Sequence, residues 1–145
     1  MSSLKRKMSM AKPQIHMIIT GAAGGIAAAT LSKIAAEYDG HLGLVDINAK
    51  GLADLAQRFS RSGLKITPYC LDLRDHQAVA EAFDSFGKET GGIDILFANA
   101  GIMTAPGPFE VTELEAIKRS IDLNFGAVAR CTLAAWPYLK TAGGS

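Results

Sequence analysis

The chain has 145 residues, of which 48% are hydrophobic and 20% are charged, and these proportions fit one globular domain with a substantial core. Its net charge of +1 does not favour nucleic acid as a partner. The longest mostly apolar stretch, residues 17–31, is too short and too rich in glycine to span a membrane, and residues 1–13 lack the pattern of a secretory signal. We expect a disordered basic tail over residues 1–13 and one cytoplasmic domain over residues 14–145, with no membrane partner.

Strand-like and helix-like patterns alternate along this domain. The expected strands cover residues 15–20, 42–45, 65–71 and 93–98, and the expected helices cover residues 26–38, 49–61, 76–90 and 112–139. Several side chains mark where these helices begin and end. They are the N-caps Asn48 and Asp75, the capping box Thr112 and Glu115, and the helix-ending glycines Gly63 and Gly91.

Four successive strand–helix units with short connections predict an α/β fold with a parallel sheet, helices on both faces and right-handed crossovers. The expected architecture is a Rossmann-type doubly wound sheet, (βα)4, with strand order 3-2-1-4. A full sheet of this type continues after its fourth strand, so we expect a domain truncated before a fifth strand. The apolar fourth strand would then form an edge that a partner could pair with.

The most informative segment is the glycine loop of residues 20–27, Thr-Gly-Ala-Ala-Gly-Gly-Ile-Ala, directly after the first expected strand. Glycines allow a tight turn and the close approach of a phosphate, and the following helix offers free N–H groups and a positive dipole end. No Gly-Lys-Ser or Gly-Lys-Thr follows, so the loop is not a P-loop. The loop therefore predicts a nucleotide cofactor.

Three further motifs follow the next expected strands. Asp46 ends the second strand, where a carboxylate can accept hydrogen bonds from both hydroxyls of an adenosine ribose. It would repel a 2′-phosphate, which favours NAD over NADP. Asp72, after the third strand, is either an acceptor for the adenine amino group or a simple turn residue. Asn99, Ala100 and Gly101 end the fourth strand with small residues that leave room for a flat ring and a ribose.

Together these motifs resemble the short-chain dehydrogenase/reductase family over residues 14–139, with Ala27 and Ala98 as small departures from its usual pattern. The resemblance implies hydride transfer between a nicotinamide cofactor, here NAD, and an alcohol or ketone carbon. It also implies that Asn124 supports a proton relay. The cofactor-binding residues that the motifs and the resemblance indicate are Thr20, Gly21, Gly24, Gly25, Ile26, Asp46, Asp72, Leu73, Asn99, Ala100 and Gly101.

The family's catalytic Ser and Tyr-x-x-x-Lys have no counterpart in these residues. The residues four positions after the three tyrosines are Leu42, Leu73 and Ala142, so none of them is a lysine. We therefore expect an N-terminal, cofactor-binding fragment that is inactive by itself and binds its cofactor weakly. Family members commonly associate through the helix that corresponds to residues 112–139, which predicts a homo-oligomer.

Cysteines and histidines are too scattered to suggest another site. Cys70 and Cys131 are expected to be buried thiols in a reducing compartment. His16, His41 and His76 lack metal-ligand spacing and are expected at the surface or at strand edges, so we predict no metal site.

Two other functions remain open from the sequence. The first is a non-catalytic module that binds a dinucleotide or a partner protein. The second is a Rossmann-type methyltransferase that uses S-adenosylmethionine, although residues 21–25 lack the Gly-x-Gly pattern that such enzymes favour. The substrate cannot be predicted, because the loop of residues 102–109 is not diagnostic.

Overall fold

A computed structural model describes residues 11–103 and 107–142 of the chain. The strands are β1 (Gln14–Thr20), β2 (Asp39–Asp46), β3 (Leu64–Cys70) and β4 (Ile95–Ala98). The helices are α1 (Gly25–Glu37), α2 (Ala49–Phe59), α3 (His76–Thr90), the short 3-10 helix η1 (Phe109–Val111), α4 (Leu114–Ile121), the π-helical turn η2 (Asp122–Gly126) and α5 (Ala127–Ala142).

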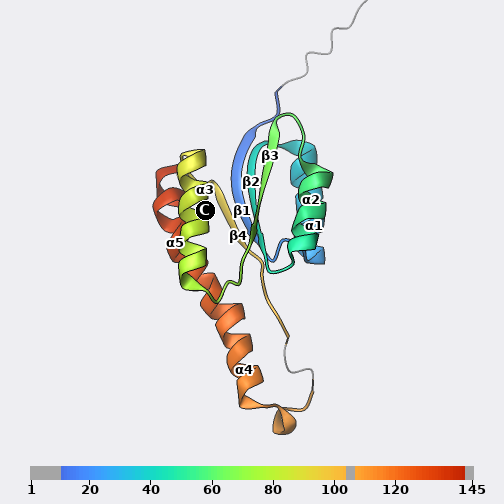
Figure 1. The fold of residues 1–145 in the computed structure, drawn as a ribbon, viewed down its shortest axis with the longest axis vertical. Coiled ribbons are helices and arrows are strands. Elements are labelled where there is room, and N and C mark those ends of the chain that lie inside the picture. Colours follow the sequence, from blue (N-terminus) through green and yellow to red (C-terminus); the bar gives the residue numbers. More distant parts are fainter. Residues whose placement is uncertain (1–10, 104–106, 143–145) are drawn as a thin grey trace, which may run out of the picture.

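The strands form one parallel sheet in the order β3-β2-β1-β4, which confirms the predicted α/β architecture and strand order (Figure 1). In the centre of the sheet, Met17 of β1 pairs with Leu42 of β2 on one side and with Ile95 of β4 on the other. Within the described residues, β3 and β4 are the two edges. The carboxyl ends of all four strands therefore point to the same side of the molecule, where the predicted motifs lie.

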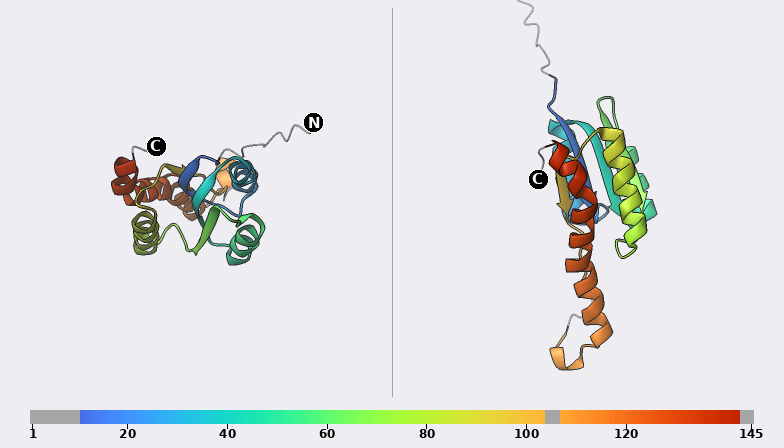
Figure 2. Two further views of the ribbon diagram at one scale, coloured as in Figure 1. Left: turned by 90° about the horizontal axis from the view of Figure 1, so that it is seen from above. Right: turned by 90° about the vertical axis from the view of Figure 1, so that its left-hand side faces the viewer.

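Helices cover both faces of the sheet (Figure 2). Successive side chains of β1 point to opposite faces of the sheet, so the strand contributes to two apolar layers. Ile15, Met17 and Ile19 face α1 and α2, whereas Ile18 faces α3 and α5. All four of these side chains are buried, as expected for a central strand of a parallel sheet. The two apolar layers hold the strand ends in fixed positions relative to one another.

Two strands begin two or three residues away from the position that the sequence pattern predicts, whereas the other two begin one residue early. β2 begins at Asp39 rather than Leu42, because Gly40 (φ 122°) runs so close to β1 that a Cβ would collide with the Ile15 carbonyl oxygen. β4 begins at Ile95 rather than Ile93. Ile93 is buried in the connection from α3, where its N–H donates to the Tyr138 carbonyl oxygen at 3.3 Å.

The predicted N-caps of α2 and α3 are confirmed. Asn48 Oδ1 accepts a hydrogen bond from the Gly51 N–H at 3.0 Å, and Asp75 Oδ1 accepts one from the Ala78 N–H at 3.0 Å. The predicted end of α3 is also confirmed, since Gly91 adopts the left-handed conformation with φ 76°.

Two other predicted helix signals are wrong. The capping box does not form: α4 begins at Leu114, the Thr112 hydroxyl donates to the Pro108 carbonyl oxygen at 3.1 Å, and Glu115 pairs with Lys118. Gly63 does not end α2, which stops at Phe59. It lies instead in the turn before β3 with φ 90°.

The long helix expected over residues 112–139 is a continuous run of α4, η2 and α5. One turn of π-helix interrupts the regular hydrogen bonding, since the Ala127 N–H donates to the Asp122 carbonyl oxygen five residues back. α5 packs beside α3, whereas α4 extends past the carboxyl end of the sheet as an arm (Figures 1 and 2). Such π turns are frequent at functional sites.

The cysteine and histidine expectations hold only in part. Cys131 is buried as predicted, and burial raises the pKa of its thiol to about 11. Cys70 is exposed, because it is the last residue of the edge strand β3, where the sheet is no longer covered. His41 is not at the surface: only 6% of it is exposed, and its Nε2 lies 2.7 Å from the Thr67 hydroxyl.

Residues 1–10 of the predicted tail lie outside the described residues. The next residues contact the domain, since the Asp39 N–H donates to the Pro13 carbonyl oxygen at 3.0 Å. Among the helices of residues 11–103 and 107–142, none is long and apolar enough to cross a membrane.

The contact between α3 and α5 depends on Gly87. A Cβ at this position would collide with the ring of Tyr138, whose hydroxyl donates to Asp84 Oδ1 at 2.6 Å. We expect Gly87→Ala to lower the free energy of unfolding by about 1–3 kcal/mol, as overpacking does. Urea denaturation of the variant and the parent chain measures this change.

The matched control is the same substitution in a Tyr138→Ala background, where the ring is absent. There Gly87→Ala should be neutral or stabilising, because alanine favours a helix interior over glycine by about 1 kcal/mol. An equal loss of stability in both backgrounds would contradict the proposed clash.

Candidate functional site

The glycine loop lies at the carboxyl end of β1, directly before α1. Gly21 has φ 63°, and a Cβ on it would lie 2.8 Å from the Ala100 Cα atom, so this position accepts only glycine. Its carbonyl oxygen accepts a hydrogen bond from the Gly24 N–H at 3.0 Å, which closes the turn. Gly24 is the N-cap of α1 and makes no side-chain cap. The helix therefore begins with its N–H groups and positive dipole end facing the space beside the loop.

Asp46, at the carboxyl end of β2, holds two neighbouring loops. Its Oδ2 accepts a hydrogen bond from the Ala23 N–H at 3.0 Å, and its Oδ1 accepts one from the Asn48 N–H at 2.9 Å. The carboxylate thus fixes the glycine loop relative to the start of α2. Each carboxylate oxygen keeps a second lone pair for a further donor.

Thr20 and Asn99 join the ends of β1 and β4. The Thr20 hydroxyl oxygen accepts hydrogen bonds from the N–H groups of Asn99 (3.1 Å) and Ala100 (3.2 Å). In return, Asn99 Nδ2 donates to the carbonyl oxygens of Thr20 (3.2 Å) and Gly21 (3.3 Å). Thr20 is only 1% exposed, so these bonds lie below the site and support it.

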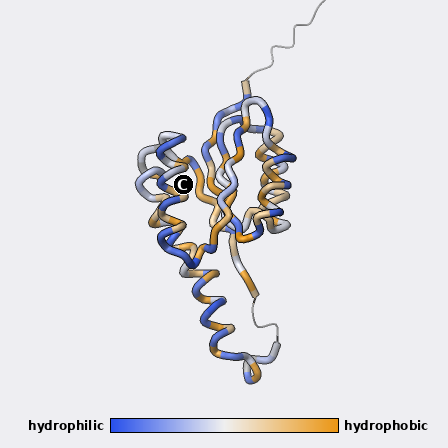
Figure 3. The backbone as a smooth tube through the Cα atoms, viewed as in Figure 1, coloured by the Kyte–Doolittle hydropathy of each residue, from blue (hydrophilic) through white to orange (hydrophobic). Residues whose placement is uncertain are grey.

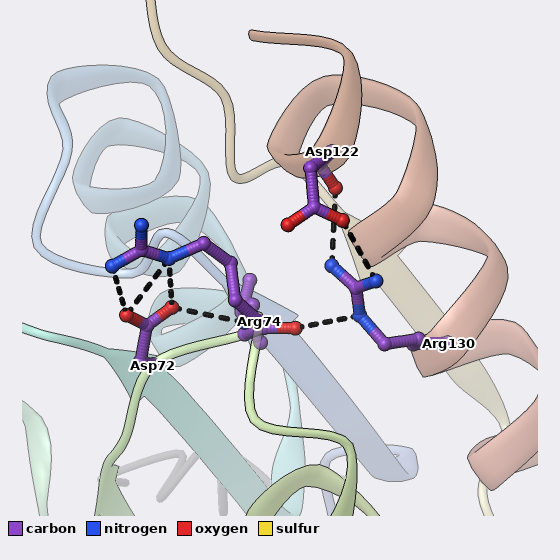
Figure 4. Close-up of polar contacts among 5 residues, drawn as sticks. Asp72, Arg74, Asp122 and Arg130 are labelled. Atoms are coloured by element: carbon purple, nitrogen blue, oxygen red, sulfur yellow. Dashed lines mark hydrogen bonds and ion pairs between the residues drawn. The ribbon is translucent and has the colours of Figure 1, made fainter. Parts of the chain in front are cut away.

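Asp72, after β3, forms an ion pair with Arg74 (Figure 4). The Asp72 carboxylate also accepts a hydrogen bond from the Arg74 backbone N–H at 2.9 Å. The hydrogen bonds from the Arg74 side chain lower the pKa of the Asp72 carboxyl below its ordinary value. The carboxylate is therefore ionised and largely committed to this turn.

Asn124 lies in the π turn η2 and is exposed. Its Oδ1 accepts a hydrogen bond from the Ile102 N–H at 2.8 Å, and its Nδ2 donates to the Ile102 carbonyl oxygen at 2.8 Å. Gly101 gives this contact room, since a Cβ there would lie 3.3 Å from Asn124 Oδ1. The side chain of Asn124 thus fixes the segment that follows β4.

Two adjoining cavities of about 320 Å³ and about 270 Å³ open at this end of the sheet, and both are lined by Gly21, Asp46, Ala100 and Gly101. All the residues predicted to bind a cofactor line one or both cavities, except Thr20. The larger cavity adds Asp72 and Leu73, and the smaller one adds Gly24, Gly25, Ile26 and Asn99. Asn124 is not among the lining residues.

Six lining residues of the larger cavity were not predicted: Ile47, Leu71, Arg74, Ile102, Arg119 and Leu123. The first four are within two residues of a predicted motif, and that adjacency is a signal that could have found them. Arg119 and Leu123 lie on α4 and η2. Their placement depends on how the helix is rotated relative to the sheet, which the motifs do not encode. Within the described parts of the chain, no group of His, Cys, Asp and Glu side chains could hold a metal ion.

The family model of the short chain dehydrogenases matches residues 15–145. The chain belongs to this family. Its fold and the order of its motifs agree with that assignment, and the expected family is confirmed.

Three comparisons illustrate the relationship. A cis-4-hydroxycyclohexanecarboxylate dehydrogenase from Sinomonas cyclohexanicum is 32% identical over 126 residues, which are 87% of this chain and 50% of the relative. The structure of carveol dehydrogenase from Mycobacterium avium, in complex with NAD, is 25% identical, with a TM-score of 0.81, and the match covers 92% of this chain and 52% of that one. A short chain dehydrogenase from Burkholderia cenocepacia J2315, in complex with NADP, is 28% identical, with a TM-score of 0.78 and coverage of 86% and 51%. The chain thus spans about half the length of these relatives.

Proposed function

We propose that the chain binds a nicotinamide dinucleotide in the two adjoining cavities and supplies the cofactor-binding part of an oxidoreductase. When bound, the cofactor would accept or donate a hydride at an alcohol or ketone carbon. Two observations support this chemistry: the proteins that resemble this chain are dehydrogenases, and the similar structures contain NAD or NADP.

The observation that carries this proposal is the free space at Gly25. The fold explains Gly21 by its positive φ, and it explains Gly24 by a carbonyl oxygen 3.2 Å from its hypothetical Cβ. At Gly25 no such reason exists in the described chain, because a Cβ there would meet nothing within 4 Å. Gly25 lines the smaller cavity at the N-terminus of α1, where a pyrophosphate would need this space and the helix dipole would attract it.

The charges around the larger cavity support NAD over NADP. Asp46 keeps free lone pairs for ribose hydroxyls, and its negative charge would repel a 2′-phosphate. Arg74 lines the same cavity, but its guanidinium is paired with Asp72 and so offers little attraction to an added phosphate. Arg119 also lines the cavity and is exposed to solvent, which screens its charge.

We further propose that Asn124 supports a proton relay by positioning. Both polar atoms of its side chain are hydrogen-bonded to Ile102, so the side chain fixes the π turn against the segment after β4. The 145 residues contain no tyrosine with a lysine four positions later. We therefore expect no turnover of alcohols or ketones by these residues alone, and weak cofactor affinity. The alcohol or ketone substrate and the cytoplasmic location stay predictions.

The helix formed by α4, η2 and α5 is proposed to pair with a second copy of the chain. Large apolar side chains are exposed at intervals along this helix: Leu114, Ile121, Phe125, Val128, Leu133 and Trp136. Hydrophobic and hydrophilic residues alternate along the same run of the backbone (Figure 3). Phe125 is 74% exposed and Leu133 is 71% exposed, which is costly for large apolar groups in water. The helix formed by α4, η2 and α5 can bury these side chains against the same helix of a symmetry-related copy.

The first prediction from the proposed function concerns Gly25. We expect the chain to bind NADH in a fluorescence titration, and we expect Gly25→Val to weaken binding by at least roughly ten-fold, about 1.4 kcal/mol, because its side chain would fill the phosphate space. The urea midpoint should stay close to that of the parent chain, since the space is empty in the fold.

The matched control is Ala29→Val, which adds the same side chain to an exposed position of α1 that lines neither cavity. It should bind NADH like the parent chain. Gly21→Ala should instead lose both stability and binding. Failure of the parent chain to bind NADH at millimolar concentration, or unchanged binding by Gly25→Val, would overturn the proposed function.

The second prediction concerns Asp46. We expect the parent chain to bind NADH more tightly than NADPH, and we expect Asp46→Asn to reduce that preference roughly ten-fold, which corresponds to one charged hydrogen bond. Titration of the parent chain and of Asp46→Asn with NADH and with NADPH measures the ratio of the two affinities in each protein. Asn keeps only one acceptor oxygen, so one of the two backbone contacts, with Ala23 or with Asn48, is lost, and urea unfolding verifies that binding is measured on folded protein. An unchanged ratio would mean that Asp46 does not select the cofactor.

The third prediction concerns association. Sedimentation velocity should show a dimer, and Phe125→Glu should shift it toward monomer because a buried, unpaired carboxylate opposes the contact. Ile47→Glu is the control, since Ile47 is similarly exposed but lies beside the cavity. A parent chain that is monomeric at all concentrations, or equal shifts in both variants, would contradict pairing through this helix.

A further inference from the structure

Arg130 of α5 connects two segments that are far apart in the sequence (Figure 4). Its Nε donates a hydrogen bond to the Leu73 carbonyl oxygen at 2.9 Å. Its Nη1 donates to Asp122 Oδ1 at 2.9 Å, and its Nη2 donates to the Asp122 carbonyl oxygen at 3.1 Å. One guanidinium thus holds both the turn after β3 and the first residue of the π turn.

Each of these two segments contributes to a wall of the larger cavity. Leu73 lines the cavity and lies between the paired residues Asp72 and Arg74. Asp122 opens the turn that contains Asn124, which in turn fixes the lining residue Ile102 through two hydrogen bonds. Arg130 therefore acts as a brace between the two walls, although it is not itself a lining residue.

The surrounding sequence is adapted to this brace at Gly126. A Cβ on Gly126 would lie 2.8 Å from Asp122 Oδ1 and 3.2 Å from Arg130 Nη1, so any other residue here would displace the ion pair from this position. The Arg130 side chain is 21% exposed and that of Asp122 is 45% exposed, so the pair is partly shielded from water. The absence of a side chain at Gly126 is a second observation, independent of the hydrogen bonds, that the π turn accommodates the Asp122–Arg130 ion pair.

Only arginine can make these three contacts together. Its guanidinium is planar and presents several N–H donors in fixed directions, so it can bind the Leu73 carbonyl on one side and Asp122 on the other. A lysine ammonium would keep the positive charge but is a single point that cannot bridge both partners. Replacing Arg130 with lysine therefore tests whether the residue acts through its three hydrogen bonds or only through its positive charge.

We propose that Arg130 is a positioning residue that fixes the turn of residues 72–74 against the π turn, and thereby sets the affinity of the larger cavity for the adenosine half of a dinucleotide. This inference rests on the proposed function, because it requires that a dinucleotide binds in the cavity. It adds to that function a residue outside the binding motifs. It also makes the two walls of the cavity respond together, because a shift of one wall is transmitted through the guanidinium.

The experiment compares the parent chain with Arg130→Lys and Arg130→Met. ADP-ribose and NADH are titrated into each, with binding followed by fluorescence and by the amide NMR signals of Leu73 and of the Asn124 side chain. We expect both variants to bind both nucleotides roughly ten-fold more weakly. In the parent chain, ADP-ribose should shift the Asn124 side-chain signal, and in Arg130→Lys that shift should be lost.

Lys118→Met is the matched control, because it removes a surface ion pair with Glu115 on the same helical arm without touching the cavity. It should bind like the parent chain. Asp122→Asn provides a second variant that preserves the size of the side chain and its acceptor oxygen, and it should weaken binding by roughly two- to three-fold through loss of the charge-assisted bond. Urea unfolding of each variant verifies that binding is measured on folded protein.

The outcomes are distinguishable. If the parent chain binds neither ADP-ribose nor NADH, the proposed function fails and this inference fails with it. If the parent chain binds and folded Arg130→Lys binds with the same affinity, or retains the Asn124 response, this inference alone is overturned. A lower unfolding midpoint with unchanged binding would mean that Arg130 is only structural.

Discussion

The candidate site depends on the close approach between the ends of β1 and β4. Gly21 lies against Ala100 so closely that no side chain fits between them, and Thr20 and Asn99 join the two backbones by reciprocal hydrogen bonds. Buried polar groups of this kind are costly unless they are satisfied, and here each has a partner. This junction fixes the glycine loop, and the loop fixes where α1 begins. The cavities on either side are consequences of that geometry.

From this junction, the walls of the larger cavity are assembled in layers. Hydrogen bonds to Asp46 join the glycine loop to the start of α2. Hydrogen bonds of Asn124 join the segment after β4 to the π turn. Arg130 then ties the π turn to the segment after β3. Most of these contacts join side chains to backbone atoms, so they fix the positions of the loops that line the cavity. A binding site made of loops on a rigid parallel sheet gains its precision in this way.

Much of this arrangement could be predicted from the sequence, because parallel strands bring all motifs that follow them to one edge of the sheet. That rule predicted many of the residues that line the cavities, but it also included Thr20, which is buried beneath them. It could not predict Arg74 as the partner of Asp72, since that pair depends on side-chain conformation. Nor could it predict Arg119, because helix rotation determines its position. The capping box at Thr112 failed because a local competitor, the Pro108 carbonyl oxygen, takes the hydroxyl.

The glycines show most clearly where sequence reasoning ends and structure becomes necessary. In the sequence, Gly21, Gly24 and Gly25 are parts of one loop, and each serves equally well as evidence of a phosphate site. In the structure, backbone conformation and close contacts account for the first two, whereas the surroundings of Gly25 leave its missing side chain without a structural reason. A residue whose identity the fold does not require is better evidence of a ligand than one the fold does require. Gly25 therefore supports a phosphate site more strongly than the rest of the loop.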